Sequence, residues 1–551
     1  MLGGAKSNFA FLQTGKTLAD HSQSLSSSIH SLAKSKSSLN IHKVGVLIIR
    51  QSMKSKKVGI IGAGLGGLSA AISLRASGYE VEVFEKNERI GGKLNVKQQD
   101  GFTFDLGPSI FTLPQFFESL FERAGKKMSD YVELESVTPH WRNFFESKPT
   151  IDLYQEDQQM RAELEKLPGD PNLHWQELQS FLAYARTQYE IVDNGYFAQG
   201  IDNLWEFLKH YKFRLFGNKI DYRNTMAGSI GNHLSDPQLR LIFEYFIKYV
   251  GSSALDSPGY MNLMPIIQFD YGLWYVKGGM YNLAVGLGKL MDELGITIHL
   301  NADVEAIEKS GKTVTGIRLA DGTVHPADII VSNMEVIPAY KKLLKEPPSL
   351  LKKLERFAPA CSGIVLHIGT NRLFPQLAHH NFFYSENQHK HFETVFHKKE
   401  LPEDPTLYVV APTRTDPEKA PQGYDNIKIL PHIPPLQDQR DLTHQHYLEL
   451  KERCIDKMER CGLEGLRDSI ITEDFLTPID IEKMYRSNQG SIYGVVTDWK
   501  KNYGFKAPKT SSKYRNLYFT GGSTNPGGGM PMVMLSGQNC ADRIIKRHPL
   551  S

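Results

Sequence analysis

The 551-residue sequence is poor in cysteine, has no strong excess of charge of either sign, and lacks a long apolar run. Its four cysteines form no CxxC pair, which argues against a disulfide scaffold or zinc ribbon and suits a reducing cytoplasm. The 64 basic and 61 acidic residues leave a formal charge of +3, so nucleic acid is not an expected partner. No stretch supplies the ~20 mainly apolar residues of a transmembrane helix.

The composition predicts a globular protein with a large packed core. Hydrophobic residues make up 40% of the chain, aromatic residues 10% and charged residues 23%, which excludes a mostly disordered or collagen-like chain. At roughly 150 residues per domain, the length suggests about three or four domain-sized units, or fewer with long insertions.

Residues 1–52 differ from the rest of the chain. They contain eleven serines, and their six Lys and Arg residues face a single acid, Asp20. No charged start followed by an apolar core is present, so a secretory signal is not expected. An organelle transit peptide is one alternative. We expect instead either a disordered extension, or a start codon placed upstream of the real one, which would then be Met53.

The first motif with chemical content begins at residue 57. An apolar strand at 57–61 leads into Gly62-Ala63-Gly64-Leu65-Gly66-Gly67, a helical pattern follows at 68–77, and a second strand at 81–84 ends at Glu85. Gly62, Gly64 and Gly67 satisfy GxGxxG, in which the glycines allow a tight turn, close approach to a pyrophosphate and close helix packing. An acid at the position of Glu85 accepts hydrogen bonds from ribose hydroxyls. The segment therefore predicts a dinucleotide site.

A second glycine pair points to FAD rather than NAD. The segment Arg89-Ile90-Gly91-Gly92-Lys93 resembles the second glycine motif of the FAD-dependent amine oxidase and phytoene desaturase superfamily, which usually has Arg where this chain has Lys93. The resemblance implies that Gly91, Gly92 and Lys93 lie near the diphosphate and flavin. Lysine keeps the charge but loses the bidentate geometry of arginine.

The C-terminal region predicts the other wall of the same site. A strand at 517–519 precedes a glycine-rich loop at 520–531 and a helix from 532 to about 547. The free N–H groups at such a helix start suit the pyrimidine edge of a flavin. The cofactor candidates here are Gly521, Gly522, Ser523, Gly529, Met530 and Met532.

The predicted fold is α/β, with a discontinuous Rossmann-type FAD-binding domain and an inserted mixed α+β substrate domain. A β-meander at 304–319 precedes a buried strand at 327–333, and the resemblance places Val304 near the adenine. We assign the FAD domain to 53–105, 277–335 and 485–551, and the substrate domain to 106–276 and 336–484.

From about residue 56 to 546 the chain resembles the carotenoid/retinoid oxidoreductase (phytoene desaturase-like) family. The segments 101–109, 245–251, 272–279 and 333–338 carry this likeness. Desaturases of the family usually have His before the proline of the C-terminal loop, whereas this chain has Asn525, as in the oxygenase branch. The resemblance implies an FAD-dependent monooxygenase that uses dioxygen to oxidise the terminal methyl of a C30 carotenoid, such as 4,4'-diaponeurosporene, to aldehyde or carboxylate in staphyloxanthin-like biosynthesis.

Two other functions stay open on the same motifs. One is a C30 or C40 carotenoid desaturase or isomerase of the dehydrosqualene or phytoene type, and the other is a non-catalytic carotenoid-binding flavoprotein. No catalytic residue stands out, and the oligomeric state is open. The histidines at 379, 380, 389, 391 and 397 lack an iron-site spacing and alternate with lysines, so we expect an exposed strand or loop and no metal.

Residues 203–216 predict contact with a membrane surface. They combine Trp205, Phe207 and Phe213 with Lys209, Lys212 and Arg214, which is typical of a helix whose aromatic side chains enter a bilayer interface. An amphipathic core helix is the alternative. We expect a cytoplasmic protein bound peripherally to the inner face of the cell membrane.

Overall fold

The computed structural model describes residues 55–198, 200–211, 220–437 and 442–550. Residues 55–550 pack as one body. The extension predicted for residues 1–52 lies outside the described residues. Among the described residues, no helix is both long and apolar enough to cross a bilayer.

A five-stranded parallel sheet carries the N-terminal motif. Its strands come from widely separated parts of the chain, in the order β20 (Leu517–Phe519), β13 (Ile329–Ser332), β1 (Lys57–Ile61), β2 (Glu80–Phe84) and β9 (Thr297–His299). All four pairings are parallel. Because β1 pairs with both β2 and β13, and β13 with β20, the ends of the chain meet in one sheet. This confirms the predicted discontinuous Rossmann-type fold.

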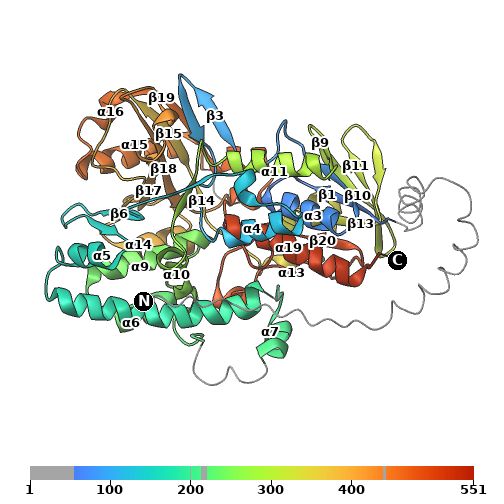
Figure 1. Ribbon diagram of the computed structural model, residues 1–551, viewed down its shortest axis with the longest axis horizontal. Helices are drawn as coiled ribbons and strands as arrows, with labels where there is room; N and C mark the ends of the chain where they lie inside the picture. Colours follow the sequence, from blue (N-terminus) through green and yellow to red (C-terminus); the bar gives the residue numbers. More distant parts are fainter. Residues whose placement is uncertain (1–54, 199, 212–219, 438–441, 551) are drawn as a thin grey trace, which may run out of the picture. The chain divides into compact units, whose positions relative to one another are not determined.

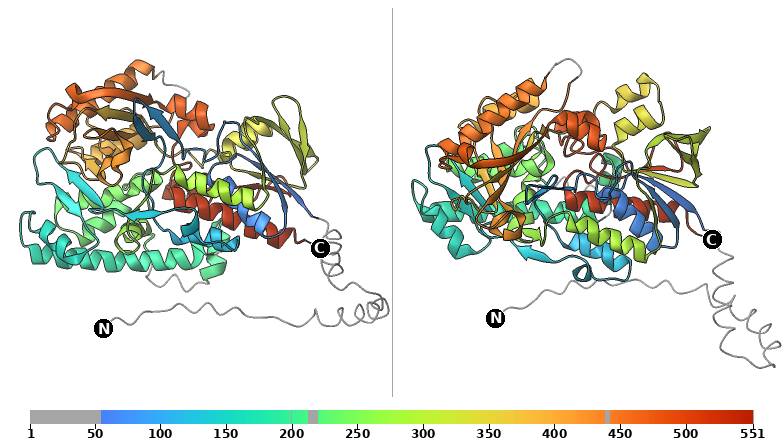
Figure 2. Two further views of the ribbon diagram at one scale, coloured as in Figure 1. Left: turned by 45° about the horizontal axis from the view of Figure 1, so that its top comes forward. Right: turned by 90° about the horizontal axis from the view of Figure 1, so that it is seen from above.

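Different elements cover the two faces of this sheet (Figures 1 and 2). One face packs on the helices α3 (Leu65–Ala76), α11 (Asn282–Glu293) and α19 (Met530–Arg547). The other packs on an antiparallel meander of β10 (Val304–Ser310), β11 (Thr313–Leu319) and β12 (Val324–Pro326). β13 and β20 are buried throughout and read as apolar runs, whereas β2 alternates valine with the more exposed Glu80 and Glu82.

The second part of the body is built on an eight-stranded mixed sheet. Its main order is β19 (Ile470–Leu476), β15 (Val365–Thr370), β18 (Asp425–Ile433), β17 (Leu407–Val410), β16 (His380–Phe383), β6 (Trp141–Phe144) and β7 (Ile151–Leu153), and β14 (Ser362–Gly363) pairs with β18. The helix α15 (His444–Arg460) packs its apolar residues on one face. Cys454 is buried in that core and Cys461 is half-buried against it.

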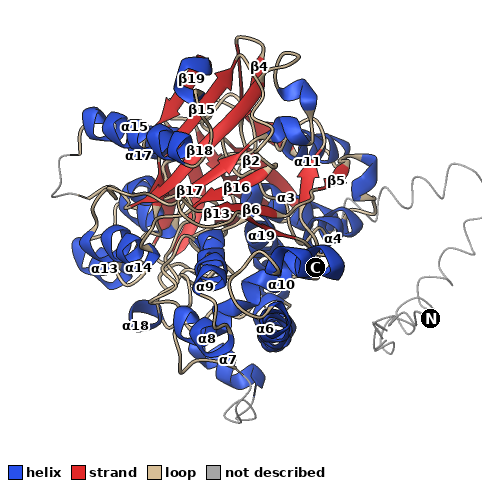
Figure 3. Ribbon diagram, turned by 90° about the vertical axis from the view of Figure 1, so that its left-hand side faces the viewer, coloured by secondary structure: helices blue, strands red, loops and turns tan. Residues whose placement is uncertain are grey.

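Helices and short strands complete the body (Figure 3). They are β3 (Val96–Gln99), β4 (Phe102–Asp105), β5 (Leu134–Ser136), β8 (Trp274–Val276), α4 (Gln115–Arg123), α5 (Asp157–Leu164), α6 (Pro171–Val192), α7 (Leu204–Tyr211), α8 (Met226–His233), α9 (Pro237–Glu244), the 3-10 helix η4 (Tyr245–Val250), α10 (Met264–Phe269), α12 (Val336–Pro338), α13 (Pro348–Leu354), α14 (Gln388–Phe392), α16 (Leu466–Ser469), α17 (Pro478–Tyr485) and α18 (Trp499–Asn502). Asp236 caps α9 by accepting from the N–H of Leu239.

One predicted domain boundary falls within a shared core. Residues 336–357 follow β13 and pack with β10 and β20 in the core behind the meander, although the sequence assigned them to the substrate domain. The other boundaries stay predictions.

Candidate active site

A cavity of about 410 Å³ runs through the body, within the size range of small-molecule sites. Thirteen of the seventeen predicted cofactor residues line it: Gly62, Gly64, Leu65, Glu85, Gly91, Gly92, Lys93, Val304, Gly521, Gly522, Gly529, Met530 and Met532. We call the wall that they form the glycine half. The opposite wall, formed by lining residues between 192 and 267 together with Val365, Tyr408, Lys428 and Leu430, is the apolar half.

The turn between β1 and α3 can be built only with glycine. Gly62 has φ of +92°, a conformation that other residues rarely adopt. A Cβ on Gly67 would lie 2.1 Å from the carbonyl oxygen of Gly62, and one on Gly64 would lie 2.7 Å from Nδ2 of Asn333. Gly64 and Leu65, at the N-terminus of α3, line the cavity, and the N-terminus of a helix favours an anion.

Glu85 lies at the end of β2, where the motif predicts it. Its carboxylate is buried and accepts hydrogen bonds from the N–H of Ala63 at 2.8 Å and the N–H of Asn87 at 3.0 Å. These contacts fix the side chain at the cavity wall and tie β2 to the glycine turn.

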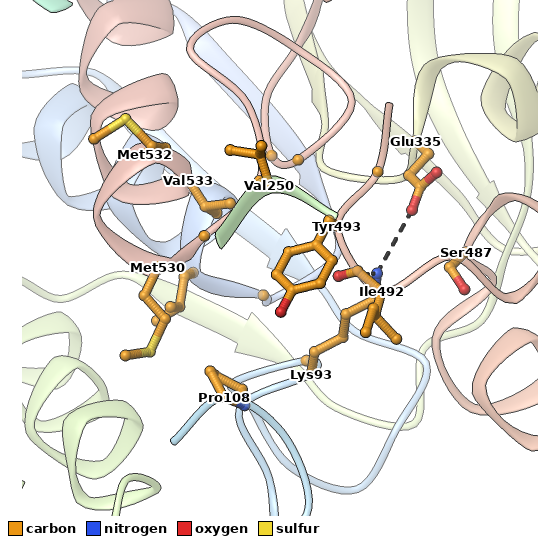
Figure 4. Close-up of a pocket in the computed structure, with 18 of the residues that line it drawn as sticks. Lys93, Pro108, Val250, Glu335, Ser487, Ile492, Tyr493, Met530, Met532 and Val533 are labelled. Carbon is orange, nitrogen blue, oxygen red and sulfur yellow. Dashed lines mark hydrogen bonds and ion pairs between the residues drawn. The ribbon is translucent and has the colours of Figure 1, made fainter. Parts of the chain in front are cut away.

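The loop with the second glycine motif, Gly91-Gly92, packs directly on the first glycine motif at 62–67. The N–H of Gly91 donates to the carbonyl of Ala63 at 2.8 Å, and Gly91 has φ of +109°. Lys93 Nζ donates to the carbonyl of Ser491 at 2.8 Å and lies 3.6 Å from Glu335 (Figure 4). Burial lowers the pKa of Lys93 and raises that of Glu335. Lys93 and Glu335 therefore form an ion pair at the cavity wall.

The C-terminal loop closes the glycine half. A Cβ on Gly66 would lie 2.9 Å from the N of Gly521, so the two loops touch through backbone atoms. Gly529 has φ of +95° and precedes α19, which begins at Met530, two residues earlier than the sequence predicted. Met530, Met532 and Val533 line the cavity at this helix start (Figure 4).

Four predicted cofactor residues do not line the cavity: Ala63, Gly66, Gly67 and Ser523. Ala63 supplies backbone hydrogen bonds to Glu85 and Gly91, and Gly66 and Gly67 allow close packing. Ser523 Oγ accepts from the N–H of Val336 at 3.1 Å. These residues support the wall rather than form it.

Asn525, the residue that suggested the oxygenase branch, also lies behind the wall. Its Oδ1 accepts from the N–H of Lys506 at 2.8 Å, and its Nδ2 donates to the carbonyls of Asp202 and Lys506. Lys509 Nζ donates to the carbonyl of Asn525 and forms a fully buried ion pair with Asp202. Asn525 therefore braces the glycine loop.

The apolar half contains two buried lysines that sequence reasoning did not single out. Lys428 Nζ donates to the carbonyls of Asp105 and Gly107 and to Ser109 Oγ, and burial lowers its pKa to about 8. Lys248 is enclosed by aromatic rings. The only sequence signal for Lys428 is that it stands between Ile427 and Ile429 in the apolar strand β18.

The histidine cluster corrects one expectation. Side chains of His389 and His397 are 58% and 50% exposed, as expected, but His379, His380 and His391 are buried. His380 begins β16, whose four residues are all buried, His379 directly precedes that strand, and His391 lies in α14. Burial lowers the pKa of His379 to about 3 and that of His391 to about 4.

Within the described ranges, one group of side chains meets the distance criterion for a metal site. Glu82, His299 and His325 lie within 4.8 Å of one another beside β2, away from the histidines considered above. Glu82 also pairs with Lys57 at 2.7 Å, and we assign no metal to it.

The predicted membrane helix is only partly what the sequence suggested. α7 ends at Tyr211, so Phe213 lies outside the described residues. Trp205 is 82% exposed, as a surface anchor requires, but Phe207 is buried. Phe207 lines the cavity and packs on Tyr222 and Phe505. Its expected contact with lipid is therefore wrong, because it faces the core.

Comparison with known proteins agrees with this geometry. The family model for flavin-containing amine oxidoreductases matches residues 65–545. The chain is 54% identical to 4,4'-diapolycopene oxygenase of Methylomonas sp. over 495 residues, 90% of this chain and 99% of the relative. It is 50% identical to 4,4'-diaponeurosporene oxygenase of Staphylococcus aureus (strain USA300) over 498 residues, 90% and 99% of the two chains.

Solved structures share the fold at low identity. A putrescine oxidase superposes with a TM-score of 0.61 at 15% identity, covering 90% of this chain and 99% of that one. An oxidoreductase from Methanosarcina mazei gives 0.59 at 15% identity, covering 88% and 100%. With the family model and both oxygenases matched over nearly the whole body, the chain belongs to the flavin-containing amine oxidoreductase family, and its cofactor is a flavin.

Proposed function

We propose that this protein is an FAD-dependent monooxygenase that oxidises the terminal methyl group of a C30 carotenoid to the aldehyde or carboxylate, with dioxygen as the oxygen source. One observation carries the proposal: a single cavity joins a glycine-lined wall of dinucleotide type to a wall of aliphatic and aromatic side chains. The names of the two oxygenases similar to this chain supply the substrate class.

The glycine half fits the ADP part of FAD. Gly62 and Gly64 carry no Cβ at the positions where backbone must approach a pyrophosphate, and the start of α3 presents N–H groups there. Glu85 and Val304 also line the cavity and would bind the ribose and the adenine. FAD would be held by these residues together with Gly91, Gly92 and the start of α19.

The apolar half suits a polyene. Leu263, Met264 and Ile267 line the wall, and such side chains bind a hydrocarbon chain by burying its surface. They also keep water from the reacting end. FAD supplies the redox chemistry when bound, and the protein's own residues hold one end of the chain in place and dry.

The protein would receive its substrate from a lipid surface. Trp205 on α7 is 82% exposed, while Phe207 on the same helix lines the cavity. Tyr503, which follows α18, is 55% exposed and also lines the cavity. Exposed aromatic residues are typical of a peripheral contact with the bilayer interface.

The test is expression in cells that accumulate 4,4'-diaponeurosporene, followed by mass analysis of the pigments. A terminal aldehyde or carboxylate supports the proposal. Additional double bonds without oxygen indicate a desaturase, and an unchanged pigment that co-purifies with the yellow protein indicates a carotenoid-binding flavoprotein. Either of these results contradicts the proposed function.

A further inference from the structure

Lys248 is a buried lysine at the cavity wall whose side chain ends among aromatic rings. Its residue is 3% exposed. Its Nζ lies 3.7 Å from the centre of the Tyr408 ring, 4.4 Å from that of Phe382, 5.0 Å from that of Trp141 and 5.1 Å from that of Tyr249. The rings come from β17, β16, β6 and η4, so four elements enclose one amine.

Other buried lysines of the body have acceptors for their N–H groups. Lys506 Nζ donates to the carbonyl of Val495 and to Thr497, and Lys457 and Lys509 pair with Asp404 and Asp202. Among the described residues, none accepts a hydrogen bond from Lys248 Nζ, and burial alone shifts its pKa. Because Lys248 lines the cavity, a ligand bound there can supply the missing acceptor.

The surroundings favour a neutral acceptor over an anion. Burial holds the pKa of Lys248 well below its usual value, and it also lowers the pKa of His380 and of His432 nearby, the latter to about 3. The Tyr408 hydroxyl is already bonded to His380 Nδ1 at 3.0 Å. An amine in this setting can donate a hydrogen bond to a carbonyl or hydroxyl oxygen.

The residue that follows Lys248 in the chain contacts the glycine half. The carbonyl of Tyr249, the next residue, is 3.5 Å from the position of a Cβ on Gly529, and a Cβ on Gly251 would meet the ring of Tyr493. Gly529 and Tyr493 both line the cavity, and Tyr493 lies near Met530 and Lys93 in Figure 4. The amine is therefore attached to a segment that borders the predicted flavin position.

We propose that Lys248 binds the oxygen of the oxygenated polyene end, donating a hydrogen bond to the alcohol or aldehyde that the first oxidation produces. This inference rests on the proposed function. A hydrocarbon end has no acceptor, so Lys248 contributes nothing to binding the first substrate. Once the end carries oxygen, the new hydrogen bond retains it for the next oxidation.

The first test measures binding to the purified holoprotein. The probes are 4,4'-diaponeurosporene and the terminal aldehyde of the same polyene. We expect Lys248→Met to weaken aldehyde binding about tenfold, equivalent to about 1.4 kcal/mol, and to leave hydrocarbon binding unchanged. Lys390→Met, which removes an exposed lysine of α14, is the control and should change neither affinity. Equal loss for both probes, or no loss for the aldehyde, overturns the proposal.

The second test needs no variant, which keeps the proposal falsifiable should Lys248→Met fail to fold. Raman spectroscopy of the bound aldehyde should show its carbonyl stretch at lower frequency than in an apolar solvent, because a hydrogen bond weakens the C=O bond. An unshifted stretch overturns the role of Lys248. Both tests measure binding and not turnover, so their results are independent of the pigment analysis. If wild-type cells showed no turnover, the proposed function would be refuted, but neither binding readout would change.

Discussion

Backbone atoms form much of the glycine half of the cavity, whereas side chains from many elements form the apolar half. In the glycine half, three loops meet through contacts such as Gly91 N–H to the Ala63 carbonyl and Gly66 against Gly521. In the apolar half, Lys248 alone is enclosed by rings from four elements. The first kind of wall tolerates almost no added atom, and the second can change its shape by exchanging side chains.

The largest effect is expected where the glycine half is tightest. Gly67→Ala places a Cβ 2.1 Å from the Gly62 carbonyl oxygen, which forces the turn apart, and the purified protein should lose its flavin completely. The flavin absorbance per protein measures this. Gly231→Ala in α8 meets no atom within 4 Å and should retain full flavin; a flavin-replete Gly67→Ala protein would contradict the assigned geometry.

The second-largest effect is expected on stability, from the buried ion pair between Lys509 and Asp202 behind the C-terminal glycine loop. Lys509→Met leaves Asp202 buried with Arg543 as its remaining ion partner, and breaking such a buried pair costs about 3 to 5 kcal/mol. Chemical denaturation measures the change. Glu133→Gln, which breaks the exposed pair with Lys277, should leave stability unchanged. A loss in Lys509→Met no larger than in this control would show that the buried pair does not brace the loop.

A smaller effect is expected on stability in acid, from a buried histidine of the predicted substrate domain. The pKa of His391 is lowered to about 4 by burial, whereas an unfolded histidine titrates near 6.5. The unfolded state therefore binds more protons between these values, and stability is lost as the pH falls through this window. From pH 7 to pH 5 the loss from His391 amounts to about 2 kcal/mol.

His391→Gln removes this contribution, so the variant should lose about 2 kcal/mol less stability than wild type between pH 7 and pH 5. Denaturation at the two pH values provides the measurement. His444→Gln, at an exposed position of α15, is the control and should follow wild type. If His391→Gln also follows wild type, the histidine is not buried as described.

The smallest effect is expected on membrane binding, from Trp205 on the surface of α7. Trp205→Ser should weaken sedimentation with anionic liposomes by up to about tenfold, since inserting a large apolar side chain contributes on the order of 1.5 kcal/mol. Leu373→Ser removes another exposed apolar residue, 47% exposed, and serves as the control. Unchanged binding of Trp205→Ser would contradict a membrane role for α7.

The contrast between the two halves also explains what could be predicted from sequence. Gly62, Gly64 and Glu85 were found because a backbone-lined site requires glycine and an acid at fixed spacing. Lys248 and Lys428 were missed because their setting depends on pairings between distant strands. The burial of His379 and His380 was missed for the same reason, since β16 becomes an interior strand only when β6, 239 residues earlier in the chain, pairs with it.

The most direct test of the central claim, one cavity that joins a flavin to a polyene end, is isotope labelling. The purified holoprotein is incubated with 4,4'-diaponeurosporene under ¹⁸O₂, and the terminal oxygen of the product is analysed by mass spectrometry immediately, before aldehyde oxygen exchanges with water. We predict one ¹⁸O atom at the polyene end. A product that gains double bonds without oxygen, or whose oxygen comes from water throughout, would contradict the account.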